Sequence, residues 1–299
     1  MEIGLIDVDS HNFPNLALMK LSSYHKSRGD HVEWWNGLKH YDRVYQSKVF
    51  DSTYTKDNEF CVMADEIIKG GTGYDLKNRL PDEIEHAYPD YSLYNIKDTA
   101  YGFLTRGCPR HCPFCIVSEK EGNTHTVADL SEWYRDQKKI VLMDSNVTAS
   151  KDCEKHFRSL AETNAVVDFE GGLDVRFMTE EKALLLNQIK VKEIHFAWDN
   201  YDDQITPKKL SEYAKVAKHK PHGYYATVYV LTNFSTTLDQ DLERIYKLRE
   251  MNFDPYVMIY DKPNASKTIR KLQRWCNNKW VFAKCEKFED YKKGEETNV

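Results

Sequence analysis

The chain has 299 residues and a formal net charge of −5, and hydrophobic residues make up 41% of it. This composition is ordinary for a globular protein with a real core, and the length suits one large α/β domain or two unequal domains. The net charge gives no reason to expect nucleic-acid binding. No apolar run approaches the ~18 residues that a membrane span needs.

The N-terminus and the cysteine content indicate a cytoplasmic protein. The first residues, Met-Glu-Ile-Gly-Leu-Ile-Asp, lack the basic start and apolar run of a signal peptide. The seven cysteines are an odd number, and three of them fall in one short segment. We therefore expect a reducing compartment, in which thiols serve metal or redox chemistry rather than disulfides.

Residues 1–98 have the pattern of a small Rossmann-like domain with a connector. Pro14 is expected in the first turn of the helix, Gly29 ends it, and Asp65–Lys69 leads into the turn Gly70-Gly71-Thr72-Gly73. Residues 74–98 read as an irregular connection. The predicted elements are a strand at 2–8, a helix at 14–28, and strands at 31–35 and 43–50.

Residues 99–299 alternate regularly between strands and helices. The predicted strands are 101–105, 140–144, 166–170, 193–197, 225–231 and 255–260, and the predicted helices are 127–138, 151–163, 180–189, 207–219, 238–251 and 264–277. Thr126 with Asp129, Thr179, and Thr206 before Pro207 are the expected helix starts. Six strand–helix units predict parallel strands in a partial (βα)6 TIM-like barrel, too few to close in the eight-stranded way. The fold class is thus α/β, with a basic extension at the C-terminus.

Three cysteines, Cys108, Cys112 and Cys115, lie within eight residues in the spacing C-x3-C-x2-C. Thiolates this close reach one soft metal centre, and three ligands would leave one iron of a four-iron cluster open. The alternatives are a zinc site that lacks its fourth ligand, a catalytic thiol pair, and chance. A zinc site would normally show a matching pair of ligands elsewhere, and the sequence has none.

Each predicted strand of the barrel is followed by polar residues, at the edge where parallel α/β folds place their sites. Helix capping accounts for several of them, Thr232 and Asp261 in particular. Capping explains less of the segment 171–176, because adjacent glycines permit close approach of a ligand and an arginine offers a bidentate partner to a carboxylate.

The cysteine segment resembles the signature of the radical S-adenosylmethionine (radical SAM) enzymes, whose core is also a partial (βα)6 barrel. The resemblance implies that Cys108, Cys112 and Cys115 hold a [4Fe-4S] cluster, and that S-adenosylmethionine binds its open iron. It also implies that the cofactor is cleaved to a 5′-deoxyadenosyl radical, which abstracts hydrogen from a substrate that the sequence does not identify. The residues that it places near the cofactor are Phe114, Asp144, Asn146, Gly171, Gly172, Asp174, Arg176 and Asn233.

The N-terminal domain resembles a degenerate cobalamin-binding domain, in Asp9-x-His11-x-x-Pro14, Ser47-Lys-Val49 and Gly70-Gly71. Pro14 and Val49 depart from that family's glycine and leucine. We expect Phe13 and Pro14 to fill the slot for the nucleotide tail, and cobalamin to be absent. His11 has a plainer interpretation, as a polar residue that caps the helix beginning near Pro14.

The expected function is that of a radical SAM enzyme served by a flavodoxin- or ferredoxin-type reductant. The alternatives are a methylthiotransferase, a cobalamin-dependent methyltransferase and, outside enzymes, a zinc-stabilised binding protein. A methylthiotransferase would need three more cluster cysteines in the N-terminal domain, which has Cys61 alone.

The segment 261–293 is basic and carries aromatic residues; we interpret it as a solvated helix face, with nucleic-acid binding as the alternative. The four scattered cysteines, Cys61, Cys153, Cys276 and Cys285, are predicted to pack.

Overall fold

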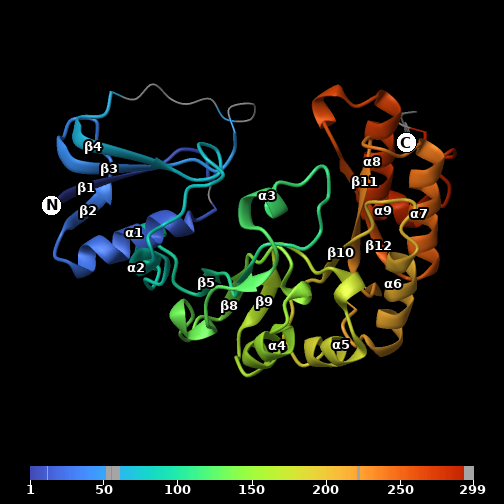
Figure 1. The fold of residues 1–299 in the computed structure, drawn as a ribbon. Coiled ribbons are helices and arrows are strands. Elements are labelled where there is room, and N and C mark those ends of the chain that lie inside the picture. The colour runs from blue at the N-terminus through green and yellow to red at the C-terminus, as the bar shows by residue number, and fades with distance from the viewer. Residues whose placement is uncertain (12, 52–54, 56–60, 221–222, 293–299) are drawn as a thin grey trace, which may run out of the picture. The chain divides into compact units, whose positions relative to one another are not determined.

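The computed structural model describes residues 1–11, 13–51, 55, 61–220 and 223–292, and the chain divides into two compact units, Met1–Met143 and Asp144–Val299 (Figure 1). Parallel sheets and intervening helices make up both units, which confirms the α/β class. None of the described helices is both long and apolar enough to cross a membrane.

The first unit begins with a four-stranded sheet in the order β2-β1-β3-β4, in which all neighbouring strands are parallel. Each element predicted in this region is present, and β4 includes the segment before the glycine turn. The elements are β1 (Glu2–Asp7), α1 (Leu16–Ser27), β2 (His31–Trp34), β3 (Tyr41–Ser47) and β4 (Ala64–Gly70).

Apolar side chains cover both faces of this sheet. Ile3 and Leu5 of β1 pack with Leu18 and Leu21 of α1, whereas Ile6 packs on the opposite face with residues of β3. Successive side chains of a strand point to opposite faces, so the unbroken apolar run of β1 requires burial on both sides.

Helix α1 begins at Leu16, two residues later than the sequence predicts. Its N-cap is Asn15, whose side chain accepts a hydrogen bond from the Leu18 backbone amide at 3.2 Å. Pro14 therefore precedes the cap instead of lying in the first turn, and His11 does not cap the helix. Both expectations were wrong because an asparagine side chain satisfies a free amide of the first turn better than the residues before it.

The rest of the first unit contains short elements and two further strand pairs. Strands β5 and β8 are parallel, and β6 and β7 form an antiparallel pair. The elements are α2 (Asp82–Glu85), η1 (Tyr91–Tyr94), β5 (Thr99–Gly102), β6 (Thr105–Arg106), α3 (Val117–Glu121), β7 (His125–Thr126), η2 (Leu130–Glu132) and β8 (Lys139–Leu142).

The helix predicted at 127–138 is wrong, because only the single 3-10 turn η2 forms there. Its capping box joins Asp129 to Glu132 and does not begin at Thr126. Trp133 follows and is almost fully buried, packed so closely over Gly102 that a Cβ at that glycine would lie 2.2 Å from the indole ring. Burial of this large side chain outweighs the local helical pattern.

The second unit continues the alternation of strands and helices. Strands β10, β11 and β12 form a parallel sheet, and α7 and α8 pack against it (Figure 1). The elements are η3 (Val147–Ala149), α4 (Cys153–Ala161), β9 (Val166–Phe169), η4 (Val175–Phe177), α5 (Glu180–Leu186), β10 (His195–Ala197), α6 (Ile205–Val216), β11 (Thr227–Thr232), α7 (Leu238–Glu250), β12 (Asp254–Ile259), η6 (Lys262–Asn264), α8 (Lys267–Asn277) and α9 (Lys279–Lys284).

The helix starts in this unit agree with the sequence in one case and differ in another. Thr179 caps α5 as predicted, accepting from the Lys182 amide at 3.2 Å. Helix α6, however, begins at Ile205, and Thr206 is buried within its first turn. The capping acceptor is Asp203, which bonds the Thr206 amide and hydroxyl.

The basic C-terminal segment uses one face of α8 for packing. Leu272, Trp275 and Cys276 are buried, and Lys267 and Arg274 are exposed. This is the solvated basic face that the sequence predicts. Among the other cysteines, Cys153 is buried as expected, but Cys61 is exposed and is not a packing thiol.

A buried ion pair ties α7 to the ends of two strands. Asp241 and Arg244 are both fully buried, with Arg244 Nη2 donating to Asp241 Oδ1 at 2.6 Å. The same guanidinium donates to the carbonyls of Trp198 at 2.5 Å and Leu231 at 2.8 Å. The hydrogen bonds offset part of the cost of taking these two charges out of water.

We expect Arg244→Ala to lower the free energy of unfolding of the second unit by about 3–5 kcal/mol, because it leaves the Asp241 carboxylate buried without its cation. Urea titration followed by circular dichroism measures the change. The matched control is Arg158→Ala, which breaks the exposed pair of Arg158 with Glu181 at 3.0 Å and should cost about 0–1 kcal/mol. Equal losses in the two variants would contradict this role for the buried pair.

Candidate functional site

The three clustered cysteines lie on one hairpin, residues 105–126, which we call the cysteine hairpin. Its stem is the antiparallel pair of β6 and β7, with Thr105 opposite Thr126 and Arg106 opposite His125. The Cys108 amide donates to the Gly122 carbonyl at 3.0 Å and closes the base of the loop. A second turn joins the Cys115 amide to the Cys112 carbonyl, also at 3.0 Å. The thiols therefore belong to one closed loop.

Gly107 makes the base of the hairpin possible. It has a φ of +83°, and a Cβ at this position would lie 2.5 Å from the Asn123 carbonyl oxygen. The Gly107 amide donates to Glu121 Oε2 at 3.0 Å, and its carbonyl accepts from Thr124 Oγ1 at 3.1 Å. No residue with a side chain fits this conformation without displacing the opposite strand.

An ion pair between Arg106 and Glu121 also stabilises the base of the cysteine hairpin. Arg106 donates to Glu121 Oε1 at 3.0 Å and lies 3.9 Å from the centroid of the Phe103 ring. Burial alone would raise the pKa of Glu121, but the Gly107 amide and Arg106 outweigh it and hold the pKa below its usual value. The carboxylate is thus charged at neutral pH and fixes both the stem and α3.

The thiols are accessible and uncommitted to disulfides. Cys108 and Cys112 are half-buried, Cys115 is exposed, and none of the three forms a disulfide; Phe114 lies between Cys112 and Cys115 in the same turn and is half-buried. Their sulfurs are not among the ligand atoms that the described residues bring close enough for a single ion. A four-iron cluster divides its ligands among several irons, so it requires a wider set of thiolates than one ion does. The donor set fits such a cluster.

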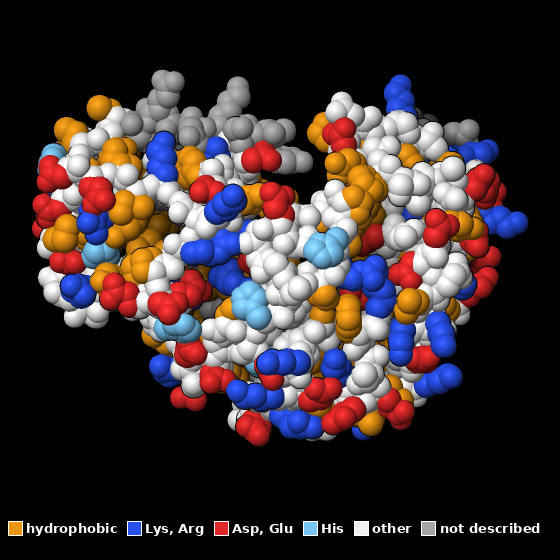
Figure 2. All heavy atoms as spheres, in the orientation of Figure 1, with side chains coloured by type: hydrophobic (Ala, Val, Ile, Leu, Met, Phe, Trp, Pro, Cys, Tyr) orange, Lys and Arg blue, Asp and Glu red, His pale blue; other side chains and the backbone are white. Residues whose placement is uncertain are grey.

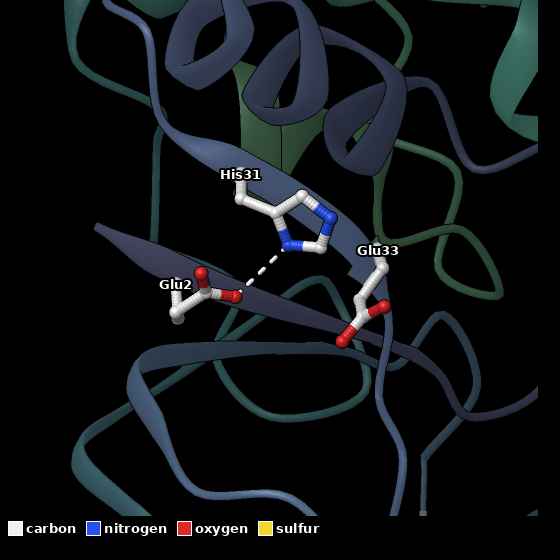
Figure 3. A group of neighbouring side chains, drawn as sticks. All are labelled: Glu2, His31 and Glu33. Carbon is white, nitrogen blue, oxygen red and sulfur yellow. Dashed lines mark hydrogen bonds and ion pairs between the residues drawn. The ribbon is translucent and has the colours of Figure 1, made fainter.

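The group that could surround a single ion is Glu2, His31 and Glu33, on the neighbouring strands β1 and β2 (Figure 3). His31 Nδ1 lies 2.9 Å from Glu2 Oε2. Lys39 Nζ already lies 2.7 Å from a carboxylate oxygen of each glutamate, so an ammonium group supplies the positive charge there. We assign this group no metal.

In the second unit, three of the predicted residues come together in one cluster. Arg176 makes a bidentate pair with Asp174, at 2.7 and 3.0 Å, and Asn146 Nδ2 donates to Asp174 Oδ2 at 3.3 Å. Two residues that sequence reasoning missed complete it. Thr148 accepts from the Asp174 amide at 3.0 Å, and Asp203 pairs with Arg176 Nη1 at 3.2 Å. We call these five residues the strand-end cluster.

The one cation of the strand-end cluster, Arg176, is paired with two carboxylates, Asp174 and Asp203. Burial would lower the pKa of Arg176, but its bonds to Asp174 and the charge of Asp203 outweigh it and raise that pKa. Burial raises the pKa of the neighbouring Asp199 carboxyl, although Arg176 and Arg244 oppose the shift. Arg176 therefore has carboxylate partners within the protein. This differs from the expectation that its guanidinium is available to bind the carboxylate of a ligand.

The predicted glycines have structural reasons of their own. A Cβ at Gly171 would lie 2.0 Å from the carbonyl oxygen of Asp144, itself a buried residue, and Gly172 has a φ of +75°. The close approach that the two glycines permit is to the protein backbone.

Asn233 is a separate case. Its φ is +63°, and its side-chain amide donates to the Tyr260 carbonyl at 2.8 Å, which ties the end of β11 to that of β12.

The N-terminal landmarks hold loops together. Asp9 is buried and accepts from the backbone amides of Val49 at 2.7 Å and Phe50 at 2.9 Å. Ser47 Oγ accepts from Asn15 Nδ2 at 2.8 Å. His11 is exposed, with its ring 6.5 Å from that of Phe50. The absence of cobalamin stays a prediction.

No protein-family model matches the chain, and no curated protein is similar to it. Residue-level chemistry alone supports a function.

The two positive-φ glycines of the cysteine hairpin provide a matched test. Gly122→Ala should cost about 1–2 kcal/mol of local stability, since Gly122 has a φ of +70° but open space around it. Gly107→Ala should cost about 1–3 kcal/mol more, because its methyl group also meets the Asn123 carbonyl. The readout is the rate of tryptic cleavage after Arg110, which depends on opening of the hairpin. Equal rates in the two variants would show that Gly107 does not hold the base.

Proposed function

We propose that this chain is a radical SAM enzyme whose [4Fe-4S] cluster is held by Cys108, Cys112 and Cys115. The observation that carries the proposal is the set of three cysteines, none of them in a disulfide, on one closed hairpin whose base Gly107 and Glu121 fix. Three thiolates leave one iron of a cubane for S-adenosylmethionine. The bound cluster would supply the electron that cleaves this cofactor reductively.

The strand order supports a partial (βα)6 barrel as the finer fold. Strands β5, β8, β9, β10, β11 and β12 are six in number, and those paired with named partners are parallel. An isolated parallel bridge between Val167 and Val191 extends β9 toward the segment before β10. Helices or turns follow the strands, which is the connection that parallel strands need.

The protein's own residues would bind and orient the cofactor. We propose that Phe114 lies near the adenine and that Asn146 and Asp174 contact the methionine or ribose end. Arg176 would be a positioning residue, because Asp174 and Asp203 already engage its guanidinium. It would hold the Asp174 carboxylate in its orientation, and Asp144, Gly171, Gly172 and Asn233 would shape the surrounding backbone.

The reaction would draw electrons from a flavodoxin- or ferredoxin-type reductant in the cytoplasm and act on an unidentified substrate. Methylthiolation lacks support because Cys153 and Cys276 are buried packing residues, and Cys61 is the one cysteine of the first unit besides the three clustered ones. A zinc-stabilised binding protein is the alternative that metal analysis separates, since it would hold zinc without sulfide.

Anaerobically reconstituted protein should bind about four iron and four sulfide ions per chain. Changing Cys108, Cys112 or Cys115 to Ala should remove most of that iron and the accompanying visible absorption, because each thiolate holds one corner of the cluster. The control is Cys61→Ala, which removes an exposed cysteine of the same unit and should leave the iron content unchanged. Full iron content in Cys112→Ala, or one zinc ion in place of iron, would refute the cluster assignment.

The cluster-loaded protein should also bind S-adenosylmethionine and, with dithionite, release 5′-deoxyadenosine slowly. We expect Asn146→Ala and Arg176→Ala to weaken cofactor binding by about 1–3 kcal/mol, because each disturbs the hydrogen bonds of a half-buried carboxylate. Anaerobic calorimetry measures the affinity. Arg158→Ala, on an exposed face of α4, serves as the control. Unchanged affinity for S-adenosylmethionine in both Asn146→Ala and Arg176→Ala would show that the cofactor-binding residues are misassigned, whatever the iron content.

A further inference from the structure

The first unit contains a cavity of about 660 Å³ that the proposed reaction does not use. It lies among α1, the ends of β3 and β4, α2 and the cysteine hairpin, and its volume is typical of a small-molecule site. On the face drawn in Figure 2, hydrophobic side chains of this unit lie in a hollow that Lys and Arg side chains border. Phe13 and Pro14 are not in its wall, and the expectation that they fill a slot for a nucleotide tail stays a prediction.

One wall of the cavity is apolar. Leu21, Tyr45 and Ile84 belong to the buried core between α1 and the sheet, and Ile68 and Leu80 pack against that core at its edge. A surface of this kind favours an apolar body, because contact with it removes hydrocarbon area from water.

The opposite side of the cavity is cationic. Lys120 is half-buried and donates to Thr72 Oγ1 at 2.6 Å, while Arg79 donates to the Lys120 carbonyl. No carboxylate of the described residues forms an ion pair with either side chain. Burial lowers the pKa of Lys120, and the nearby charges of Arg106 and Arg79 lower it further, although Glu121 opposes them. An anion at this point would relieve the repulsion.

The carboxylates of the wall do not supply that anion. Glu85 pairs with Lys20 at 2.9 Å, and Glu83 accepts from the Tyr24 hydroxyl at 2.9 Å. Asp75 and Asp82 are exposed at the rim, where water screens them. Glu121, the remaining carboxylate of the wall, pairs with Arg106 at 3.0 Å. Among the described residues, Lys120 and the exposed Arg79 are therefore the wall cations left without an ion pair.

We propose that this cavity binds a small molecule with an apolar, ring-sized body and one anionic end, which Lys120 and Arg79 hold. The body would lie against Tyr45, Ile68 and Ile84. Because Lys120 is the neighbour of Glu121, the anionic end would contact the helix that secures the cysteine hairpin. The proposal does not require the cluster.

Two fluorescent probes that differ by one charge test the proposal on the full chain. 8-Anilinonaphthalene-1-sulfonate carries a sulfonate, and N-phenyl-1-naphthylamine has the same rings without it. We expect one equivalent of the sulfonate to bind, and to bind more tightly than the neutral probe. Lys120→Gln should weaken sulfonate binding about tenfold, the effect of losing one charge-assisted bond, and leave the neutral probe unaffected. Lys77→Gln, an exposed lysine outside the wall, should change neither.

A second variant tests the location independently of charge. Ala17 is half-buried on α1 and lines the cavity, so Ala17→Trp should place an indole in it and weaken binding of both probes while circular dichroism stays unchanged. Binding of several equivalents, undiminished sulfonate binding in a folded Ala17→Trp, or a Lys120→Gln variant that affects the two probes equally would each overturn the proposal.

Discussion

Parallel strand pairing is the constraint on which this structure depends. A parallel pair cannot be joined by a tight turn, so each pair needs a crossover that lies over a face of the sheet. In β1 this produces an apolar run buried on both sides, with Leu5 and Ile6 in different cores. It also places the carboxyl ends of successive strands at one edge of each sheet, where side chains distant in sequence meet. The Asp174–Arg176 pair and its partners on the loops after β8 and β10 are a result of that geometry.

The sequence predicts the strands and most of the helices because their patterns are local. The missing helix at 127–138 shows where local pattern fails. Its outcome is decided by Trp133, whose indole occupies the space that Gly102 leaves on β5, a contact between residues about thirty positions apart. Nothing in the periodicity of residues 127–138 encodes that glycine. Thr206 fails for a similar reason, since Asp203 provides the cap and leaves the threonine hydroxyl as a donor inside the turn.

The candidate site divides in the same way. The cysteine spacing is a local feature and can be found by inspection, whereas the need for glycine at position 107 follows from its positive φ and the nearby Asn123 carbonyl. What could not be found is the internal pairing of Arg176. Its partner Asp203 was not singled out in the sequence; it caps α6 while also pairing with the guanidinium. An arginine at a strand end therefore indicates a charge cluster, but whether the partner is a ligand or the protein itself depends on tertiary contacts.

Helix α3 shows how closely two tasks can be placed in a short element. It has five residues, and its last two differ in sign and in role. Glu121 turns toward the stem and holds the Gly107 amide and Arg106, whereas Lys120 reaches Thr72 beside the glycine turn that follows β4. Neighbouring residues on a helix point about 100° apart, so one short turn can face two surroundings at once. A shift of α3 that improved one contact would strain the other. For this reason the hairpin that carries the cysteines and the wall of the cavity are mechanically linked through adjacent residues.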